Sequence, residues 1–552
     1  MKLLKNIFIY GSLYFHTIRH LKAKQIFFRV LRSINLKKKT DIDVTHKGIR
    51  KSVRSWTKSI SKKVFIPEDS KFLFLNLLQI VDNKNDWNNK NYTKLWLYNL
   101  HYFDYINSHE SNSFNKEKEI IKTWITDNPA FYGVGWDPYP SSIRIVNWIK
   151  WLYENNYSNK EIEDSIFLQS KHLFNNIEYH ILGNHLFSNA KALIFAGLFF
   201  KGQESKVWLS KAESILKKEL SEQILPDGGH YELSPMYHSI ILEDILDLHN
   251  IFNCHKKNVN YELVESISKM FKWLESMIHP DNKISFFNDS AHGIASSPKD
   301  LEVYRRRLKI KLHLEKNDLY FNDLKHSGYT STLQKDIFLV VDRGNVGPNY
   351  LPGHAHADTL SFELSIFKNR FIVNLGTSLY EDGAERLKQR GTANHSTLLI
   401  NDVNSSNVWS SFRVAQRAKI VSRSNYINDD LIEISGMHDG YSSLKGKLFH
   451  ERTWKVLDDK IEIIDLIKGK GTQDLKLIFP LHPDVIISGL NDNIVNCKLN
   501  EKEVSISFSS EGMVKVKNCN YHPYFGVSIP SKKIIYEELR TLPLTLKTVI
   551  SW

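Results

Sequence analysis

The chain has few cysteines and lacks the patterns that several protein classes require. Its three cysteines, Cys254, Cys497 and Cys519, lie far apart in 552 residues and do not have the spacing of metal ligands. A disulfide between Cys497 and Cys519 is conceivable, but reduced thiols in the core are the better interpretation. No internal repeat and no long low-complexity segment occur, so neither a repeat array nor a largely disordered chain is indicated.

The sequence also lacks an apolar run long enough to cross a membrane, although its N-terminus resembles a leader. Residues 7–15 are mostly apolar and follow a basic start, but no small-residue cleavage site comes after them. Basic and histidine side chains at 16–24 then interrupt the apolar pattern. We predict a basic, amphipathic helix that packs on the protein or makes a peripheral contact with a membrane surface. A cytoplasmic location is favoured, and a periplasmic one is the alternative.

The charge of the chain is basic, with 74 Lys and Arg against 61 Asp and Glu and a net charge of +13. This favours an anionic partner: nucleic acid, a membrane surface or an acidic polysaccharide. Because no nucleic-acid-binding motif occurs and the basic residues are spread along the chain, we expect no nucleic-acid partner. A carboxylate pair of the kind that hydrolyses glycosidic bonds does not stand out either.

The length and the 42% hydrophobic content indicate a multidomain protein with α and β parts. Apolar residues recur mostly at helical spacing from about 117 to 312, and at the spacing of strands from 337 onward. We predict an N-terminal helical arm and connection over 1–90, a helical domain over 91–320 and an antiparallel β-sandwich over 330–552. Short connections between helices indicate hairpins stacked into a solenoid or toroid. Helices are expected at 141–154, 160–176, 184–200, 205–223, 235–252 and 261–278.

The most informative segment is LPGHAHADTLSFELSIFKNRFIVNLGTSLYEDGAERLKQRGTANHSTLLIND, at 351–402. Strands are expected at 362–366 and 371–375, with polar residues gathered at their ends. In an extended segment His354 and His356 face the same side, because alternate residues of a strand do so. A sheet edge that carries several titratable groups is typical of a catalytic surface, and a polar sandwich rim is the alternative.

Three stretches of the helical region combine polar and aromatic residues: WDPYPSSIRIVNW, GNHLFSNAKAL and LPDGGHYELSPMYH. Aromatic rings stack on sugars and arginine holds carboxylates, while a turn before a helix presents side chains and free N–H groups to a ligand. The structural alternatives are core aromatics, an asparagine that caps a helix and buried tyrosines at a helix entry. The candidate residues here are Trp136, Tyr139, Arg144, Asn184, His185, Tyr231, Glu232 and Tyr237.

The runs HAHADTLSFEL, VNLGTSLYE and QRGTANHSTLLIND resemble the C-terminal half of the heparinase II/III-like polysaccharide lyases. More specifically, the chain resembles the branch associated with bacterial capsule and O-antigen gene clusters. The resemblance covers roughly 96–482. It implies an incomplete (α/α) toroid followed by an antiparallel β-sandwich, and β-elimination of an acidic, uronic-acid-containing, glycosaminoglycan-like polysaccharide.

The resemblance also implies roles for individual residues. A catalytic asparagine is implied in GNH and a catalytic tyrosine in SPMYH, and the expected catalytic residues are Asn184, His185, Tyr237 and His354. Asparagine, histidine and an arginine can neutralise the uronate carboxylate so that its C5 proton becomes acidic. Tyr237 is expected to act as base if cationic neighbours lower its pKa, and then as acid toward O4, with His354 as the second candidate base.

The expected substrate-binding residues are Trp136, Tyr139, Arg144, Tyr231, Glu232, Arg386, Arg390 and Asn394. The two arginines at 386 and 390 lie four residues apart in one helical turn and are expected to clamp acidic groups of the polymer. As an alternative, they brace the loop by pairing with Glu381, Asp382 or Glu385.

No cofactor is expected to be required, but a structural zinc or calcium ion is an open alternative. Relatives with a bound ion use positions that match His356, Asn374 and His395 here, with an aspartate at the second position. Asparagine removes the anionic ligand and weakens a zinc site, although Asp358 is a conceivable substitute. Without the ion, His356 and His395 would orient His354 through hydrogen bonds. The rival functions are a non-catalytic polysaccharide-binding or assembly protein and a metal-dependent hydrolase built on the HxHxD run.

Overall fold

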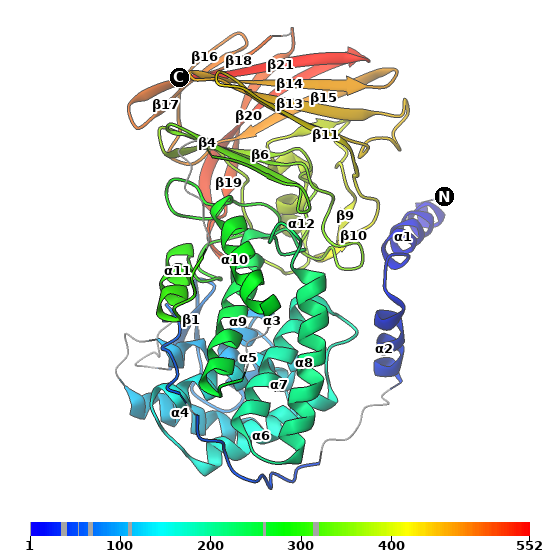
Figure 1. The fold of residues 1–552 in the computed structure, drawn as a ribbon. Helices are drawn as coiled ribbons and strands as arrows, with labels where there is room; N and C mark the ends of the chain where they lie inside the picture. The colour runs from blue at the N-terminus through cyan, green and yellow to red at the C-terminus, as the bar shows by residue number, and fades with distance from the viewer. Residues whose placement is uncertain are drawn as a thin grey trace.

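The computed structural model describes residues 2–34, 41–52, 54–63, 70–108, 113–257, 261–312, 320–509 and 511–552. An incomplete (α/α) toroid is followed by an antiparallel β-sandwich domain, as predicted, and Figure 1 shows the sheets stacked on one end of the helical domain. None of the helices within the described ranges has the length and apolar character needed to span a bilayer. All three cysteines are buried and unpaired.

The helices begin with an N-terminal arm and continue through the toroid. The arm consists of α1 (Lys2–Ile18) and α2 (Ala23–Ser33). The toroid contains α3 (Lys94–Tyr102), α4 (Phe114–Asp127), α5 (Pro138–Glu154), α6 (Lys160–Asn175), α7 (Gly183–Phe199), α8 (Gln203–Gln223), α9 (Pro235–Cys254), α10 (Tyr261–Glu275) and α11 (Pro298–Arg307). The ends of the six helices predicted from apolar spacing lie within three residues of those of α5 to α10.

The strands of the β-domain form three main antiparallel sheets. The first has the order β3 (Tyr320–Leu324), β4 (Tyr329–Gln334), β5 (Ile337–Asp342), β6 (Phe362–Ile366) and β7 (Asn369–Ile372). The second has the order β11 (Ile420–Ile427), β12 (Ile432–His438), β13 (Phe449–Val456), β14 (Lys460–Lys468), β21 (Leu544–Ser551), β18 (Lys502–Phe508), β17 (Ile494–Leu499) and β16 (Ile486–Asn491). The third has the order β19 (Met513–Tyr521), β20 (Ile529–Thr541), β15 (Thr472–Pro480) and β8 (Leu398–Ile400).

Two short hairpins and one helix complete the fold. They are β1 (Lys71–Phe74) with β2 (Leu77–Ile80), β9 (Val408–Trp409) with β10 (Arg413–Val414), and α12 (Ala384–Arg390). Side chains alternate between buried and partly exposed along β14, as the period of two in its sequence predicts.

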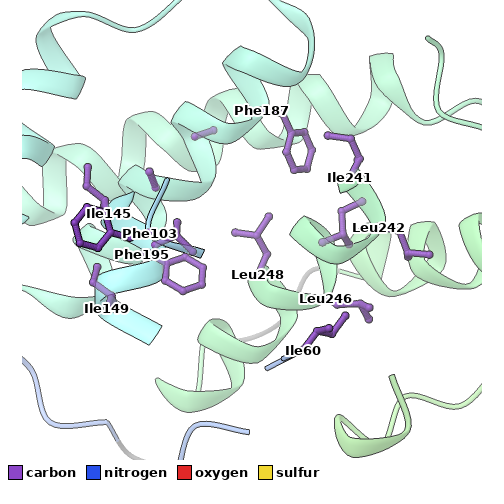
Figure 2. Packing of buried hydrophobic residues seen from close by; sticks show 14 of the residues in the cluster. Ile60, Phe103, Ile145, Ile149, Phe187, Phe195, Ile241, Leu242, Leu246 and Leu248 are labelled. Carbon is purple, nitrogen blue, oxygen red and sulfur yellow. The ribbon is translucent and has the colours of Figure 1, made fainter. Parts of the chain in front are cut away.

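Apolar packing holds the two domains against each other. Figure 2 shows the core of the toroid, where side chains from α5, α7 and α9 lie together with Ile60 and Phe103 from earlier segments of the chain. Val373, Leu375 and Tyr521 of the β-domain belong to this same apolar cluster. Because the core crosses the boundary between the domains, loops of the β-domain have a fixed position over the toroid.

The N-terminal arm packs on both domains. Gln25 of α2 is fully buried, and its Nε2 donates to the carbonyl oxygens of Ile181 and Tyr350 at 3.2 and 3.4 Å. On α1, Thr17 accepts a 3.1 Å hydrogen bond from the indole of Trp409 in β9. Packing on the protein, one of the two expected arrangements, is therefore present. The outer face of the arm exposes apolar side chains such as Phe15, Phe27 and Val30, and the peripheral membrane contact stays a prediction.

A buried histidine of α3 makes the stability of the toroid depend on pH. His101 is fully buried, and its Nε2–H donates to the Trp87 carbonyl at 2.8 Å while Nδ1 accepts from the Trp124 indole at 2.9 Å. Burial, and then the charge of Arg144, lowers its pKa from 6.5 to about 3. The ring therefore stays neutral in the folded protein at pH values where the unfolded chain binds a proton.

This stabilisation is complete above pH 6.5 and is lost as the pH falls toward 3. We expect this one group to lower the free energy of unfolding by about 2 kcal/mol between pH 6.5 and pH 5. Urea denaturation at pH 7.5, 6 and 5 measures the slope, and His101→Gln, which does not titrate, should reduce it by about one proton. An unchanged slope in the variant would show that His101 is not the group responsible.

Candidate active site

A cavity of about 1620 Å³ opens where the toroid, the N-terminal arm and loops of the β-domain meet. Its wall includes side chains from α5, α7 and α9 and from residues 351–354 and 410–413 of the β-domain. The predicted site residues on this wall are Tyr139, Asn184, His185, Glu232, Tyr237 and His354.

The first turns of α7 and α9 place two of these residues. Gly183 begins α7 with a φ of +63°, a conformation that favours glycine, and an added Cβ would lie 2.4 Å from Leu351 Cδ2, so that side chain would have to shift. Asn184 follows it inside the helix and is not the cap that the sequence indicated. At α9, the Ser234 hydroxyl accepts from the backbone N–H of Tyr237 at 3.2 Å, which caps the helix and turns Tyr237 toward the cavity.

His185 is held by an acid and an aromatic ring. Its Nδ1 donates to Glu178 Oε1 at 3.1 Å, and its ring stacks on Tyr139 with the centroids 4.2 Å apart. Asn189 fixes Glu178 from behind through Nδ2 at 3.1 Å. Burial alone would raise the pKa of Glu178, but His185 and Asn189 hold it below its usual value. The Nε2 of His185 is left without a partner among the described residues and is available to a ligand on the cavity wall.

His354 is positioned by Asp289, a residue that sequence analysis did not single out. Its Nδ1 donates to Asp289 Oδ2 at 2.9 Å, and Nε2 of His356 donates to Asp289 Oδ1 at 2.9 Å. Arg386 pairs with both oxygens of the same carboxylate. Burial would raise the pKa of Asp289, but Arg386 and the two histidines hold it well below its usual value.

The path of the chain at these histidines differs from the prediction. Residues 354–356 form a turn and an irregular segment instead of a strand, and β7 ends at Ile372 instead of at 375. The two histidines therefore do not face one site through strand alternation: both contact the Asp289 carboxylate, but only His354 lines the cavity. Because Nδ1 of His354 carries its proton toward Asp289, Nε2 keeps a free lone pair on the cavity wall.

Tyr237 faces a second tyrosine. Its hydroxyl lies 3.0 Å from that of Tyr380, and its ring stacks on His354 with the centroids 3.9 Å apart. The expectation that cationic neighbours lower the pKa of Tyr237 is wrong, because burial and then Tyr380 raise it well above 10. Tyr380 lines the cavity as well. It lies in VNLGTSLYE, so the motif drew attention to the segment but not to this residue.

Glu232 brings an acid close to the unprotonated nitrogen of His354. Its side chain is buried, and Oε2 lies 3.6 Å from His354 Nε2. Burial raises the pKa of Glu232, against the opposing effects of His354, His185 and the Asn184 backbone. A carboxyl group with a raised pKa binds a proton more readily and therefore opposes a neighbouring anion less than an ordinary glutamate does.

Three of the expected substrate-binding residues of the toroid lie outside the cavity wall. Trp136 packs in the core against Trp124, with the ring centroids 5.9 Å apart. Arg144 is fully buried, and its Nε donates to Gln169 at 2.9 Å. Tyr231 is buried behind the wall. Each of them follows the structural alternative, in which aromatic and polar side chains anchor loops.

The expected substrate contacts of the β-domain are corrected in the same way, because none of these residues lines the cavity. Arg386 is saturated by Asp289 and the Ser411 carbonyl, not by the neighbouring acids that the alternative named. Arg390 is fully buried and donates to backbone carbonyls, including that of Ala355 at 2.8 Å. Asn394 donates to the Lys388 carbonyl at 2.8 Å. These side chains hold the loops that carry His354.

The candidate metal residues lie together but form a hydrogen-bonded chain. His356 Nδ1 is 3.3 Å from His395 Nε2, and His395 Nδ1 is 2.9 Å from the Asn374 side chain. Burial lowers the pKa of His356 to about 4 and that of His395 well below its usual value, so both rings are neutral. His395 donates through Nε2 to His356 Nδ1, and His356 donates through Nε2 to Asp289. The Asn374 oxygen lies at His395 Nδ1; turning the amide so that Nδ2 faces this nitrogen supplies the donor that it needs and satisfies an Nδ2 that otherwise lacks a partner among the described residues.

This donor set does not fit a metal ion. Both nitrogens of His356 are already engaged, by His395 and by Asp289. The Asp289 carboxylate also pairs with Arg386 and His354, and no group of three side chains in the ranges that the structure describes is arranged to hold an ion. Asp358 does not replace the missing acid, because its carboxylate accepts from the Asn288 backbone.

We expect the purified protein to hold only substoichiometric zinc or calcium and to keep its activity in a chelator. Asn374→Asp should bind zinc at least about tenfold more tightly, since it restores an anionic ligand. Elemental analysis after equilibration with each metal measures the bound ion. A stoichiometric ion in the unaltered protein would contradict the hydrogen-bonded arrangement.

Known proteins share both halves of this architecture. Residues 14–310 match "Heparinase II/III N-terminus" and residues 317–552 match "Heparinase II/III-like, C-terminal". A heparin-sulfate lyase of Bacteroides stercoris is 25% identical over 247 residues, which are 41% of this chain and 37% of that protein. A heparin-sulfate lyase of Pedobacter heparinus is 26% identical over 266 residues, 43% of this chain and 39% of that protein. The matched region thus spans about two fifths of the length of these curated relatives.

Solved structures show the same fold at low sequence identity. A crystal structure of heparinase III has a TM-score of 0.65 at 16% identity and covers 86% of this chain and 79% of its own. A mutant of the heparan sulfate lyase HepC from Pedobacter heparinus has a TM-score of 0.59 at 17% identity, with 88% and 81% covered. The family matches extend from residue 14 to residue 552 apart from 311–316, and the first alone covers more than half of the sequence. The chain belongs to the heparinase II/III-like family.

Proposed function

We propose that the protein is a polysaccharide lyase that cleaves an acidic, uronic-acid-containing glycan by β-elimination. The observation that carries the proposal is the arrangement of His354 and Tyr237 in ring contact on one cavity wall, with Asn184 and His185 on the same cavity. Family membership and the names of the heparin-sulfate lyase relatives support the same class of reaction and a glycosaminoglycan-like substrate.

His354 and Tyr237 have complementary protonation states for this reaction. The free Nε2 of His354 accepts the C5 proton, while the phenol of Tyr237, kept protonated by burial, donates to the departing O4. The C5–H electron pair forms the C4=C5 double bond as the C4–O4 bond breaks. Tyr380, 3.0 Å from the Tyr237 hydroxyl, can pass a proton back to it from the cavity. The assignment makes His354 the base and Tyr237 the acid.

Three other groups suit the uronate carboxylate. The amide of Asn184, the second nitrogen of His185 and the raised-pKa carboxyl of Glu232 line the same cavity. Preorganised donors at this point stabilise the charge that grows on the carboxylate as the C5 proton leaves. Tyr139, stacked on His185, offers an aromatic face beside them.

The polymer in this proposal is a bacterial surface glycan of the capsule or O-antigen type. The resemblance of the chain to the branch associated with such gene clusters supports this choice. The basic net charge of +13 favours an acidic polymer.

The test follows the ultraviolet absorbance of the unsaturated uronate during incubation with heparan sulfate, alginate, polygalacturonate and purified capsule and O-antigen glycans. A rise with one polymer is expected. If a polymer binds but yields no double bond, the protein is a polysaccharide-binding or assembly protein and the lyase proposal fails. New reducing ends without a double bond, abolished by chelator, would identify a metal-dependent hydrolase instead.

A further inference from the structure

The cavity mouth beside the N-terminal arm carries three arginine side chains. Arg29 and Arg32 belong to α2 and Arg413 to β10, and all three line the cavity. We call these residues the arginine rim. Gln25, Arg29 and Arg32 have the spacing i, i+4 and i+7, which places them on one face of α2. Because Gln25 is fully buried against the protein, this face of α2 is the one directed toward the cavity.

The structure leaves the arginine rim largely free to bind a ligand. Arg29 donates to the His180 carbonyl at 3.2 Å, Arg32 to His180 Nε2 at 2.8 Å and Arg413 to the Tyr14 hydroxyl at 3.2 Å. A guanidinium group has five N–H donors, so most donors of each group have no hydrogen-bond partner among the described residues. Arg413 also lies over the rings of Tyr14 and Trp409. Within the part of the chain that the structure describes, no carboxylate forms an ion pair with any of the three.

The charges of the rim residues act on a common region. Arg29 and Arg32 both contact His180, and after burial the charge of Arg413 lowers the pKa of Arg29. Like charges gathered without an acid between them disfavour the empty site and favour one that holds an anion. Elsewhere on the arm, by contrast, Lys22 is paired with Glu222.

The arginine rim is connected to the proposed reaction site through two segments of the chain. Arg413 follows Phe412, whose ring lies 5.9 Å from that of His354 and 5.2 Å from that of Tyr380. His180, which two of the arginines contact, lies in the connection that leads into α7 and its His185. An extended polymer whose reacting sugar contacts His354 therefore reaches the rim with a neighbouring sugar.

We propose that the arginine rim is an anion subsite that binds a carboxylate or sulfate group on a sugar next to the reacting uronate. This inference rests on the proposed lyase function. A planar guanidinium binds either group through two parallel hydrogen bonds, so two or three arginines can fix one acidic sugar. The subsite makes α2 a part of the substrate cleft, which gives the contact of the arm with both domains a role in substrate binding.

The test compares Arg29→Gln/Arg32→Gln and, separately, Arg413→Gln with the unaltered full-length protein. Arg413→Gln leaves the residues of α2 and the Gln25 contacts unchanged, but it removes the hydrogen bond to Tyr14 of α1. Tyr14→Phe removes that hydrogen bond alone, so an effect of Arg413→Gln that Tyr14→Phe lacks is not explained by weaker attachment of the arm. Lys24→Gln/Lys211→Gln is the matched control for the double variant: both lysines lie over the Tyr179 ring and neither lines the cavity. We expect KM to rise about tenfold in the double variant with kcat unchanged, because the lost contacts act equally on ground and transition states.

Calorimetric titration separates failure of this inference from failure of the lyase proposal. Heparan sulfate oligosaccharides and their unsulfated counterparts are titrated into each variant, whether or not they are cleaved. Weaker binding of both ligands in the arginine variants supports a carboxylate subsite, and weaker binding of the sulfated ligand alone supports a sulfate subsite. Equal affinity in the arginine variants and the control overturns the subsite even if turnover occurs. If the unaltered protein binds neither ligand and cleaves no polymer, the subsite is overturned as well.

Discussion

Tyr237→Phe is expected to lower kcat by about a hundredfold to ten-thousandfold, the usual contribution of a positioned general acid. The variant keeps the ring that stacks on His354 and loses only the hydroxyl that faces Tyr380. Substrate affinity should change little, because the proton is transferred only as the C4–O4 bond breaks. Rates of double-bond formation and titration of bound oligosaccharide measure the two quantities separately.

Tyr231→Phe is the matched control for this substitution. It removes the same atom from a buried tyrosine six residues away that does not line the cavity. Its kcat should stay within about twofold of the unaltered protein, since it loses no group that transfers a proton. Near-normal turnover in Tyr237→Phe would sink its role as acid and make Tyr380, whose hydroxyl lies 3.0 Å from that of Tyr237, the next candidate.

Helices of the toroid, and the candidate motifs at their first turns, could be located from sequence because their information is local. Apolar spacing located α5 to α10, and the turn before α9 carries its own cap in Ser234. Asn184 and Tyr237 lie in the first turns of two such helices. A helix start that is recognised in the sequence therefore also gives their place within the helix, from which both reach the cavity.

The direction of a side chain within a motif could not be predicted. Arg386 and His354 occur in one polar segment, yet His354 lines the cavity while Arg386 is buried beneath it. Sequence spacing cannot distinguish a residue that contacts a ligand from one that braces the loop. The contrast depends on Asp289, which lies 65 residues before His354 and binds both side chains.

The arginine rim was missed for a related reason. From its own sequence, the basic N-terminal helix is predicted either to pack on the protein or to contact a membrane surface, and nothing in it indicates a place beside a substrate site. Their place beside the cavity depends on Gln25, which donates to carbonyls of residues 181 and 350. Contacts over more than a hundred residues leave no periodic pattern in either segment.

Asp289→Asn is expected to destabilise the protein by about 3 to 5 kcal/mol, because it leaves the guanidinium of Arg386 buried without its counter-charge. Both side chains are fully buried, so water does not replace the lost partner. Urea denaturation at pH 7.5 measures the loss. Asp289→Asn/Arg386→Gln removes both charges and should recover part of the stability, since no isolated charge then remains in the core.

Activity should not recover in that double variant, and this separates a positioning role of Asp289 from a purely structural one. An aspartate at 289 requires Nδ1 of His354 to carry the proton, which leaves Nε2 unprotonated as the base. The amide of asparagine can instead donate to Nδ1 and stabilise the tautomer that carries its proton on Nε2. We expect kcat to fall at least about a hundredfold in both variants, with the loss persisting at high pH because the wrong tautomer is still neutral. If the double variant regained both stability and turnover, the carboxylate would serve only to neutralise Arg386, and the base at His354 would not depend on it.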